Sequence, residues 1–571
     1  APDSESAPSL TAEAETASSA DRSQVAREAL EGVESETGLW IVQLDEPSVS
    51  ELAAGHSGST AQHAQQVAAG HVALEGEINA TLGRTVDVAF TYDNVLNAIA
   101  IEADADEAAQ LWDIDGVAAV FPDTVRELDT DVSHEVIQSA AAWDGANAPE
   151  IATQGEGVIV AMIDSGVNPD HPSFAATGGD GYTHVNPNGA GVFLGACNTE
   201  AGFECNDKLI GAYTFNGSTA RDTDGHGSHT GSTMAGNVHT AEFTLGTADF
   251  EREVSGVAPH ANVISYKVCN PGCPSSATIA AVNQAIADDV EVINYSISGT
   301  DNPWLDPVDL AFLEAHNAGI SVSASGGNDG PGASTVAKTG PWNLSVAATT
   351  HNRVFGNPVS VTSDGAPEEL VGIPGFPGDG PAITSVYTGD VVDAETVTPG
   401  NGNGCAAFPA GSMTDGIALI QRGACTFQVK VENAEAAGAV AVVLYNNVSG
   451  PPTAPGGLTT TTVPAVMITL ESGQALRDYV AANDPTEVSI GTDVVLVEDD
   501  TWTDLVAGFS SRGPSRFDML APTLAAPGVN ILAAYAESGG DPLQYGVISG
   551  TSMASPHAAG MAALMREVYP E

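Results

Sequence analysis

Basic residues are scarce in this sequence. The 571 residues include 16 Lys and Arg against 74 Asp and Glu, which gives a formal net charge of −58, and only four of the 16 are Lys. A field of that sign repels nucleic acid and anionic membrane surfaces, so both are excluded as partners. Two interpretations stay open: high solubility of a secreted protein, or adaptation to salt, whose ions screen the self-repulsion.

Long apolar runs are absent as well. No stretch is long enough to cross a bilayer, and the polar, acidic residues 1–5 do not resemble a signal peptide. Such a start is typical of a chain whose export signal has been removed, so we expect a secreted, extracellular protein. Because apolar residues make up 43% of a long chain, we also expect several packed domains.

Cysteine is sparse, and its six positions fall into three local pairs. Zinc binding is one interpretation, but no pair has His or Cys partners at a repeated metal-ligand spacing. Disulfides in an oxidising compartment are favoured, although six cysteines allow many connectivities and only proximity suggests a pairing. The expected pairs are Cys197 with Cys205, Cys269 with Cys273, and Cys405 with Cys425.

The first part of the chain divides into a leader and a small domain. Residues 1–36 are rich in Ala, Ser and Glu without apolar periodicity, which is typical of a flexible acidic leader. From Gly38 the pattern changes to strands and helices in the order βαββαβ, which predicts a ferredoxin-like domain over residues 37–128. The expected elements are strand 39–44, helix 59–82, two strands within 86–101, helix 104–114 and strand 117–121.

Beyond this domain, short β-branched runs alternate with helical patterns, which predicts an α/β fold with a doubly wound parallel sheet. The expected strands are 158–163, 262–268, 290–297 and 320–325, with helices at 278–288 and 310–317. Residues 355–499 are instead rich in Gly, Pro and Thr and predict a β-rich insertion. The α/β domain would then comprise residues 129–354 and 500–571.

Asp164 directly follows the predicted strand 158–163. In open α/β sheets, functional groups gather at the carboxyl ends of strands, so this position favours a catalytic role. A lone Asp that opens a turn before Gly166 is the simpler interpretation. The remaining motifs must decide between the two.

His226 lies between Gly225 and Gly227, which allow another segment of backbone to approach closely. This arrangement suits a general base. A metal site made by His226 and His229 is an alternative, but it lacks a Glu between the histidines and further ligands at fixed spacing.

Ser552 lies in Gly-Thr-Ser-Met-Ala-Ser-Pro, before a predicted helix that runs through Val568. Pro556 is expected in the first turn of that helix, where its missing N–H costs nothing. A serine at a helix N-terminus faces backbone N–H groups that can stabilise a developing oxyanion. An ordinary helix cap is the alternative interpretation.

Asn328 follows the predicted strand 320–325 and is flanked by glycines. Its side-chain amide could donate to an oxyanion, whereas a turn Asn is the simpler interpretation. Together, Asp164, His226, Asn328 and Ser552 resemble the motifs of the subtilisin-like serine proteases in type, context and chain order. The resemblance covers residues 133–363 and 506–571.

This resemblance implies hydrolysis of internal peptide bonds through an acyl-enzyme, without a cofactor. Ser552 would attack, His226 would act as base and then acid, Asp164 would hold the imidazolium, and Asn328 with the Ser552 N–H would form the oxyanion hole. Structural calcium is common in this family, but no loop here is specific enough to assign a site. The residues expected to bind substrate are Ser296, Ile297, Ser298, Gly326 and Gly327.

Two flanking regions extend the resemblance. Residues 37–128 resemble the family's inhibitor propeptide, with processing expected between about Leu128 and Ser133, so the chain would be a zymogen inhibited by its own propeptide. The insertion resembles a protease-associated domain, which would gate substrates, bind a partner or act as a spacer. The chain ends at Glu571, where relatives continue, so we expect a C-terminal truncation.

Two other classes of function agree less well with the sequence. A lipase or esterase also uses Ser, His and Asp, but it favours Gly-x-Ser-x-Gly and the chain order Ser, Asp, His. Ala554 breaks that motif, and the chain order differs. A catalytically silent binding or adhesion protein on the same fold predicts the loss of a triad residue, and none is missing. The sequence therefore predicts a secreted serine endopeptidase that acts on proteins or peptides.

Overall fold

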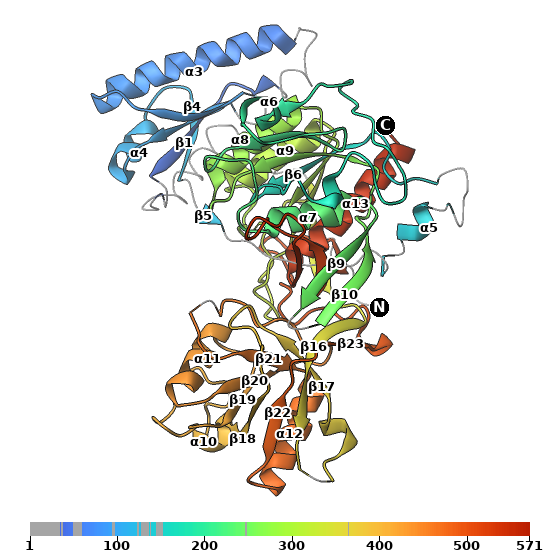
Figure 1. Ribbon diagram of the computed structural model, residues 1–571. Coiled ribbons are helices and arrows are strands. Elements are labelled where there is room, and N and C mark those ends of the chain that lie inside the picture. Colours follow the sequence, from blue (N-terminus) through green and yellow to red (C-terminus); the bar gives the residue numbers. More distant parts are fainter. Residues whose placement is uncertain are drawn as a thin grey trace, which may run out of the picture.

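A computed structural model of the protein describes residues 35, 38–49, 60–93, 97–122, 125–126, 136–137, 139–143, 145, 152–245, 248–297, 299–363, 365–458 and 460–570 (Figure 1). It contains a central α/β domain, a small α+β domain that packs against it, and an insertion below it in Figure 1. The predicted leader, apart from Ser35, and the predicted processing junction 128–133 lie outside the described residues.

An eight-stranded sheet forms the centre of the α/β domain, and all of its paired strands are parallel. The side chains of β6 and β11 are buried on both faces, as expected for β-branched runs in a covered parallel sheet. In spatial order the strands are β24 (Leu524–Pro527), β15 (Asn343–Thr349), β14 (Ser321–Ser325), β13 (Val292–Tyr295), β6 (Ile159–Asp164), β11 (Asn262–Lys267), β8 (Leu209–Thr214) and β7 (Leu194–Gly195).

Helices cover both faces of this sheet, which confirms the predicted doubly wound α/β fold. On one face, α7 (His226–Ala235) packs against α13 (Thr551–Val568), and their small residues let the two helices approach the sheet closely. On the other face lie α8 (Ser275–Ala287) and α9 (Pro307–Asn317). Two short helices, α5 (Ser139–Trp143) and α6 (Ala196–Thr199), lie at the periphery.

The small domain has the predicted ferredoxin-like order, with an antiparallel sheet arranged β2-β3-β1-β4. Helices α3 and α4 cover one face of that sheet, and the other face packs on α8 of the α/β domain. Its elements are β1 (Leu39–Leu44), α3 (Thr60–Leu82), β2 (Val88–Tyr92), β3 (Ala98–Glu102), α4 (Ala105–Leu111) and β4 (Val117–Pro122).

A short strand leads out of this domain along the α/β domain. Strand β5 (Val125–Arg126) pairs antiparallel with β12 (Cys273–Pro274), which directly precedes α8. The chain that follows the small domain therefore adds an edge strand beside the α/β domain.

The insertion contains a second sheet that closes on itself. Strand β17 pairs with both β21 and β16, so seven strands form a ring, in which β18 to β21 are parallel neighbours. The strands are β16 (Arg353–Val361), β17 (Ile373–Pro377), β18 (Tyr387–Asp393), β19 (Ile417–Gln421), β20 (Ala441–Tyr445), β21 (Ala465–Ile468), β22 (Glu487–Ile490) and β23 (Val495–Glu498). Helices α10 (Ala394–Val397), α11 (Phe427–Ala436) and α12 (Leu470–Ala482) complete it.

A hairpin of the α/β domain contacts the first strand of the insertion. The rings of Phe243 and Phe250, on the hairpin of β9 (His239–Leu245) and β10 (Ala248–Val254), lie 5.8 Å and 5.0 Å from that of Phe355 on β16. The hairpin of β25 (Ile531–Ala534) and β26 (Tyr545–Ile548) leads directly into α13. Within the described part of the chain, no helix is both long and apolar enough to span a membrane.

Candidate active site

The candidate residues lie at the carboxyl edge of three adjacent strands. Strand β6 ends at Asp164, β13 ends immediately before Ser296, and β14 ends immediately before Gly326. The register pairs Tyr295 with Ile163 on one side and with Ala324 on the other. Ser296 and Asp164 are therefore neighbours across one strand spacing, about 4.8 Å.

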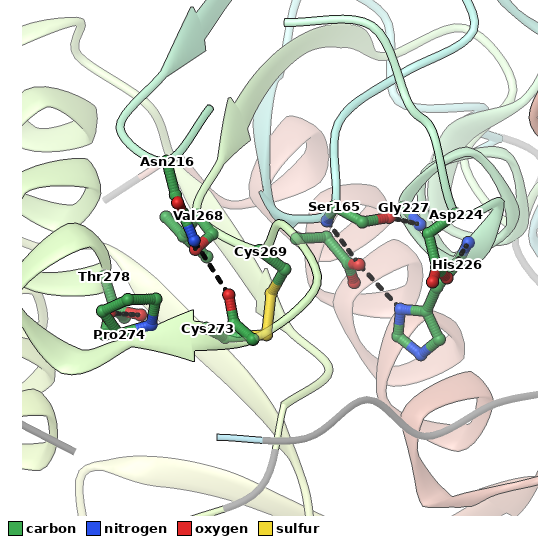
Figure 2. The surroundings of a disulfide bond; sticks show 12 residues. Ser165, Asn216, Asp224, His226, Gly227, Val268, Cys269, Cys273, Pro274 and Thr278 are labelled. Atoms are coloured by element: carbon green, nitrogen blue, oxygen red, sulfur yellow. Dashed lines mark hydrogen bonds and ion pairs between the residues drawn. A yellow bond between two sulfur atoms is a disulfide. The ribbon is translucent and has the colours of Figure 1, made fainter. Parts of the chain in front are cut away.

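Asp164 and His226 form a buried pair. Oδ1 of Asp164 lies 2.7 Å from Nδ1 of His226 and accepts the N–H of Ser165 at 2.7 Å, while Oδ2 accepts the hydroxyl of Thr230 at 3.1 Å. The side chains of Asp164 and His226 are 0% and 2% exposed. Because a carboxylate only accepts, Nδ1 donates and the lone pair of the neutral ring is on Nε2. Figure 2 shows the His226 ring beside Ser165 and Gly227.

The start of α7 fixes the position of His226. Asp222 accepts the N–H of Gly225, the hydroxyl of Ser165, and both the N–H and the hydroxyl of Ser228. Gly225 has φ of 114°, and a Cβ there would lie 2.3 Å from the Tyr535 ring. Only glycine meets both requirements at this position.

Ser552 lies in the first turn of α13, and two bonds join it to Ser296. Its hydroxyl donates to the Ser296 carbonyl at 2.9 Å, and the Ser296 hydroxyl donates to the Ser552 carbonyl. The prediction that Pro556 lies in the first turn was wrong, because α13 begins at Thr551 and Pro556 lies inside it. Pro556 cannot donate to the Ser552 carbonyl four residues earlier, and Ser296 supplies that bond instead.

Asn328 is joined to the start of the same helix. Its side-chain oxygen accepts the N–H of Thr551 at 2.9 Å and the Thr551 hydroxyl at 3.1 Å. These two donors orient the amide, so its NH₂ group is directed away from Thr551. Thr551, Asp222 and Thr230 were not predicted, because Thr and Asp are common residues and the partners that give them a role, Asn328, Ser165 and Asp164, are distant in sequence.

The glycines among the predicted substrate-binding residues have backbone groups that are already hydrogen-bonded within the protein. The backbone groups of Gly326 bond to Val346 and Ala337, and those of Gly327 bond to Thr551 and Ser511. We therefore expect these glycines to leave space for a substrate, because they lack side chains, rather than to form hydrogen bonds with it. Ile297 is buried beside Ser296, and Ser298 lies outside the described residues.

His229, the other half of the alternative metal pair, is fully buried on α7. Its Nε2 lies 3.1 Å from the Ile531 carbonyl, and burial lowers its pKa to about 3. In the described ranges, no group of three or more His, Cys, Asp or Glu side chains is arranged to hold a metal ion.

Three disulfides join the same cysteine pairs that proximity had predicted: Cys197–Cys205, Cys269–Cys273 and Cys405–Cys425. Figure 2 shows the Cys269–Cys273 bridge on the segment beside the candidate site. The N–H groups of Val268 and Cys269 both donate to the Asp164 carbonyl, and Cys273 begins β12. This short loop therefore connects the Asp164 backbone with the strand that pairs with β5.

Comparison with known proteins places this geometry in a family. Residues 155–571 match the subtilase family, also called peptidase S8, and residues 40–129 match the peptidase inhibitor I9 family. The chain belongs to the subtilase family. The inhibitor match coincides with the ferredoxin-like domain and β5, so this subtilase carries its inhibitor domain in the same chain.

Curated relatives support the assignment. Subtilisin-like protease SBT1.4 of Arabidopsis thaliana is 32% identical over 84% of this chain and 64% of its own length, and SBT1.5 is 32% identical over 84% and 65%. The chain thus spans just under two thirds of these relatives. The crystal structure of a psychrophilic subtilisin-like protease, Apa1 from the Antarctic psychrotroph Pseudoalteromonas sp. AS-11, matches 73% of this chain and 85% of that chain, with 18% identity and a TM-score of 0.37.

Proposed function

We propose that this subtilase is a serine endopeptidase synthesised as a zymogen, with Asp164, His226 and Ser552 as its catalytic triad. The observation that carries the proposal is the buried Asp164–His226 pair, one strand spacing from the Ser296 carbonyl to which the Ser552 hydroxyl donates. Family membership makes a metal site or a helix cap a poor explanation for the same residues.

In the proposed mechanism, Ser552 Oγ exchanges its bond to Ser296 for one to Nε2 of His226. His226 takes the proton as Oγ attacks the substrate carbonyl, and Asp164 stabilises the imidazolium from Nδ1. The proton then passes to the leaving amine, and a water molecule hydrolyses the acyl-enzyme by the same two steps. These steps use side chains of the chain alone and require no cofactor.

The oxyanion would be held by the amide of Asn328 and the backbone N–H of Ser552. The two donors from Thr551 orient the Asn328 amide before substrate binds, so little reorganisation remains for the reaction. The helix N-terminus at Thr551 adds a positive potential at the same place. We expect Ser296, Ile297 and Ser298 to bind the substrate backbone, and Gly326 and Gly327 to leave room for its side chain.

The proposed inhibitor domain would block the site through its C-terminal segment. Its sheet packs on α8, and β5 occupies the edge of β12 as an extended peptide substrate would. Processing between about Leu128 and Ser133 would release it. We further propose secretion, which agrees with three disulfides, and a protease-associated role for residues 355–499 in gating substrates or binding a partner.

Active-site labelling tests the function. The purified chain should incorporate a fluorophosphonate probe at Ser552 and cleave peptide substrates, which a lipase or esterase would not cleave, and Ser552→Ala should abolish both. Ser555→Ala is the matched control, because Ser555 lies in the same helix turn and bonds to Asn294 and Ser323. A chain that binds peptides but takes up no probe after its inhibitor domain is removed would instead be a silent binding protein.

A further inference from the structure

All four lysines of this chain are buried, which is unusual for a residue that ordinarily lies in solvent. One of them, Lys430 on α11, lies beside the Cys405–Cys425 disulfide of the insertion. Its Nζ lies 3.6 Å from Sγ of Cys405 and 3.5 Å from Sγ of Cys425. The same ammonium donates to the carbonyls of Asn403 and Gly423. The cation therefore contacts both sulfur atoms and the backbone that leads to each cysteine.

The surroundings of Lys430 favour an anion at either sulfur. Its oxygen acceptors are neutral carbonyls. Burial, and to a smaller extent repulsion from the Arg422 guanidinium, lower the pKa of Lys430 to about 8. The amine is still mostly charged at pH 7, so a thiolate formed beside it would gain a charge-assisted contact at once. The sulfur of Cys425 also lies just before Thr426, the cap of α11, and a helix N-terminus favours negative charge.

This disulfide can be approached from solvent. Both of its cysteines are partly exposed, and the small residues Ala406 and Ala424 beside them are exposed, as is Thr426. The Cys269–Cys273 bridge differs, because its two residues are 2% and 0% exposed. Access and a nearby cation are the two conditions that make thiol–disulfide exchange fast, and the bridge of the insertion meets both.

We propose that the Cys405–Cys425 disulfide is a redox site, at which small thiols and dithiols exchange with the folded insertion while Lys430 stabilises the thiolate that is released. The proposal goes beyond the endopeptidase function and does not depend on it. The two other disulfides of the chain are structural and exchange more slowly.

The exchange needs only the reductant and the two cysteines. A thiolate of the reductant attacks Sγ of one cysteine and forms a mixed disulfide. The Cys405–Cys425 bond breaks, and its electron pair passes to the other sulfur, which leaves as a thiolate beside Nζ of Lys430. With a dithiol, the second thiol loses its proton to water and attacks the reductant's own sulfur in the mixed disulfide. The reductant leaves as a cyclic disulfide, and the first cysteine takes up a proton.

The insertion should stay folded after this reduction. The bonds from Lys430 to Asn403 and Gly423 hold the two segments together without the bridge. The side chain of Asn433, one turn further along α11, donates to the Gly404 carbonyl at 2.8 Å and adds a second link. We therefore expect reduction to be local and reversible.

The first experiment compares two bridges within one chain. The full chain with Ser552→Ala, which prevents self-cleavage, would be treated with dithiothreitol at pH 7, quenched with iodoacetamide and analysed by mass spectrometry. Cys197–Cys205 is the internal control, because its cysteines are also partly exposed but no lysine donates to its sulfurs within the described residues. We expect Cys405–Cys425 to be reduced about tenfold faster or more, the value of one hydrogen bond to a charged group.

The second experiment changes the cation. Lys430→Met should slow reduction of Cys405–Cys425 about tenfold and leave the rate of Cys197–Cys205 unchanged. Lys430→Arg keeps a positive charge and should retain most of the fast rate. If neither variant folds, the comparison of the two bridges in the chain that keeps Lys430 decides alone.

Three results would overturn the redox site. They are reduction of Cys405–Cys425 no faster than that of Cys197–Cys205, a rate in folded Lys430→Met equal to or above that of the parent, and a rate that does not rise with dithiothreitol concentration. The last would mean that the insertion must unfold before the thiol attacks. None of these readouts involves peptide cleavage, so failure of the redox site leaves the endopeptidase proposal standing, and the reverse also holds.

Discussion

The inhibitor domain and the insertion are attached to the same α/β domain in opposite ways. The inhibitor domain shares a core with it, because Ile41, Tyr92 and Phe121 belong to one buried apolar cluster with Ala277 and Ala280 of α8. The insertion has two buried clusters of its own, and its contacts with the α/β domain include the aromatic rings around Phe355 and a hydrogen bond from the Asn530 side chain to the Pro452 carbonyl.

The two ends of the insertion also meet each other. Arg353 on β16 pairs with Glu498 on β23, and the Asp499 N–H donates to Asn352. The chain thus leaves the α/β domain and returns at nearly the same point. A shared core therefore couples the stability of two units, whereas a closed sheet with adjacent ends makes a unit independent.

The largest expected effect comes from removing each unit in turn. A chain without residues 1–126 should yield almost no active enzyme after dilution from denaturant, because it exposes the α8 face and its parallel sheet folds slowly. A chain in which a short Gly-Ser linker replaces residues 354–497 should refold and label with fluorophosphonate. Equal recovery of the two chains would contradict the comparison, and added inhibitor domain should rescue the first.

Acid should next distinguish the insertion from the α/β domain to which it is attached. Burial lowers the pKa of His171 and His229 to about 3 and that of His351 to about 4, whereas the unfolded chain has ordinary values near 6.5. As the pH falls below about 6.5 the unfolded state binds these protons first, so stability is present above pH 6.5 and is lost on acidification. Three histidines give a slope of about 4 kcal/mol per pH unit.

Residues 355–499 contain no histidine, so this effect is absent from the insertion. Calorimetry should show that the unfolding temperature of the α/β domain is lower at pH 5 than at pH 7. The unfolding temperature of the insertion should be nearly the same at both pH values. Parallel shifts of both transitions would show that the insertion unfolds together with the α/β domain.

The disulfides provide a third comparison. Replacing Cys405 and Cys425 by Ser should lower the free energy of unfolding of the insertion by about 3 kcal/mol, because the bridge closes a loop with a sequence separation of 20 residues. Cleavage of short peptides should not change. Replacing Cys269 and Cys273 should instead raise KM, since their loop carries β12. The measurements are denaturant titration and steady-state kinetics on both double variants.

The smallest effect concerns one hydrogen bond across the shared core. The hydroxyl of Tyr92 donates to the Ser276 carbonyl at 3.1 Å. Tyr92→Phe should weaken inhibition by the separate inhibitor domain about fivefold, the value of one neutral hydrogen bond. Phe355→Leu, at the contact of the insertion, should leave that inhibition constant unchanged, and a change of equal size would mean that the insertion also affects the docking of the inhibitor domain.

Much of the α/β fold could be predicted from the sequence because its strands are short β-branched runs. The predicted strand 158–163 became β6 (Ile159–Asp164), and the predicted 262–268 became β11 (Asn262–Lys267). The start of α13 could not be predicted, since the bond that replaces the missing N–H of Pro556 comes from Ser296, more than 250 residues away. The closed ring of the insertion likewise depends on the pairing of β16 with β17 and β22 together.

The candidate site was predictable where a residue follows a strand. Asp164 and Asn328 could be proposed because strand ends mark them, whereas Ser296, inside the predicted strand 290–297, was proposed from the family resemblance. The residues that orient them, Thr230 and Thr551, could not, because their partners are distant in sequence. The pairing of β5 with β12 was also missed, since two-residue strands leave no pattern.

The burial of every lysine has a practical consequence for handling this protein. Reagents that acylate primary amines, such as those used for biotinylation, fluorescent tagging or coupling to resins, find no lysine on the folded surface. Glycation by sugars is restricted in the same way, and a lysine-specific digest requires unfolding first. Attachment through the many surface carboxylates, activated by a carbodiimide, is the better route to an immobilised enzyme.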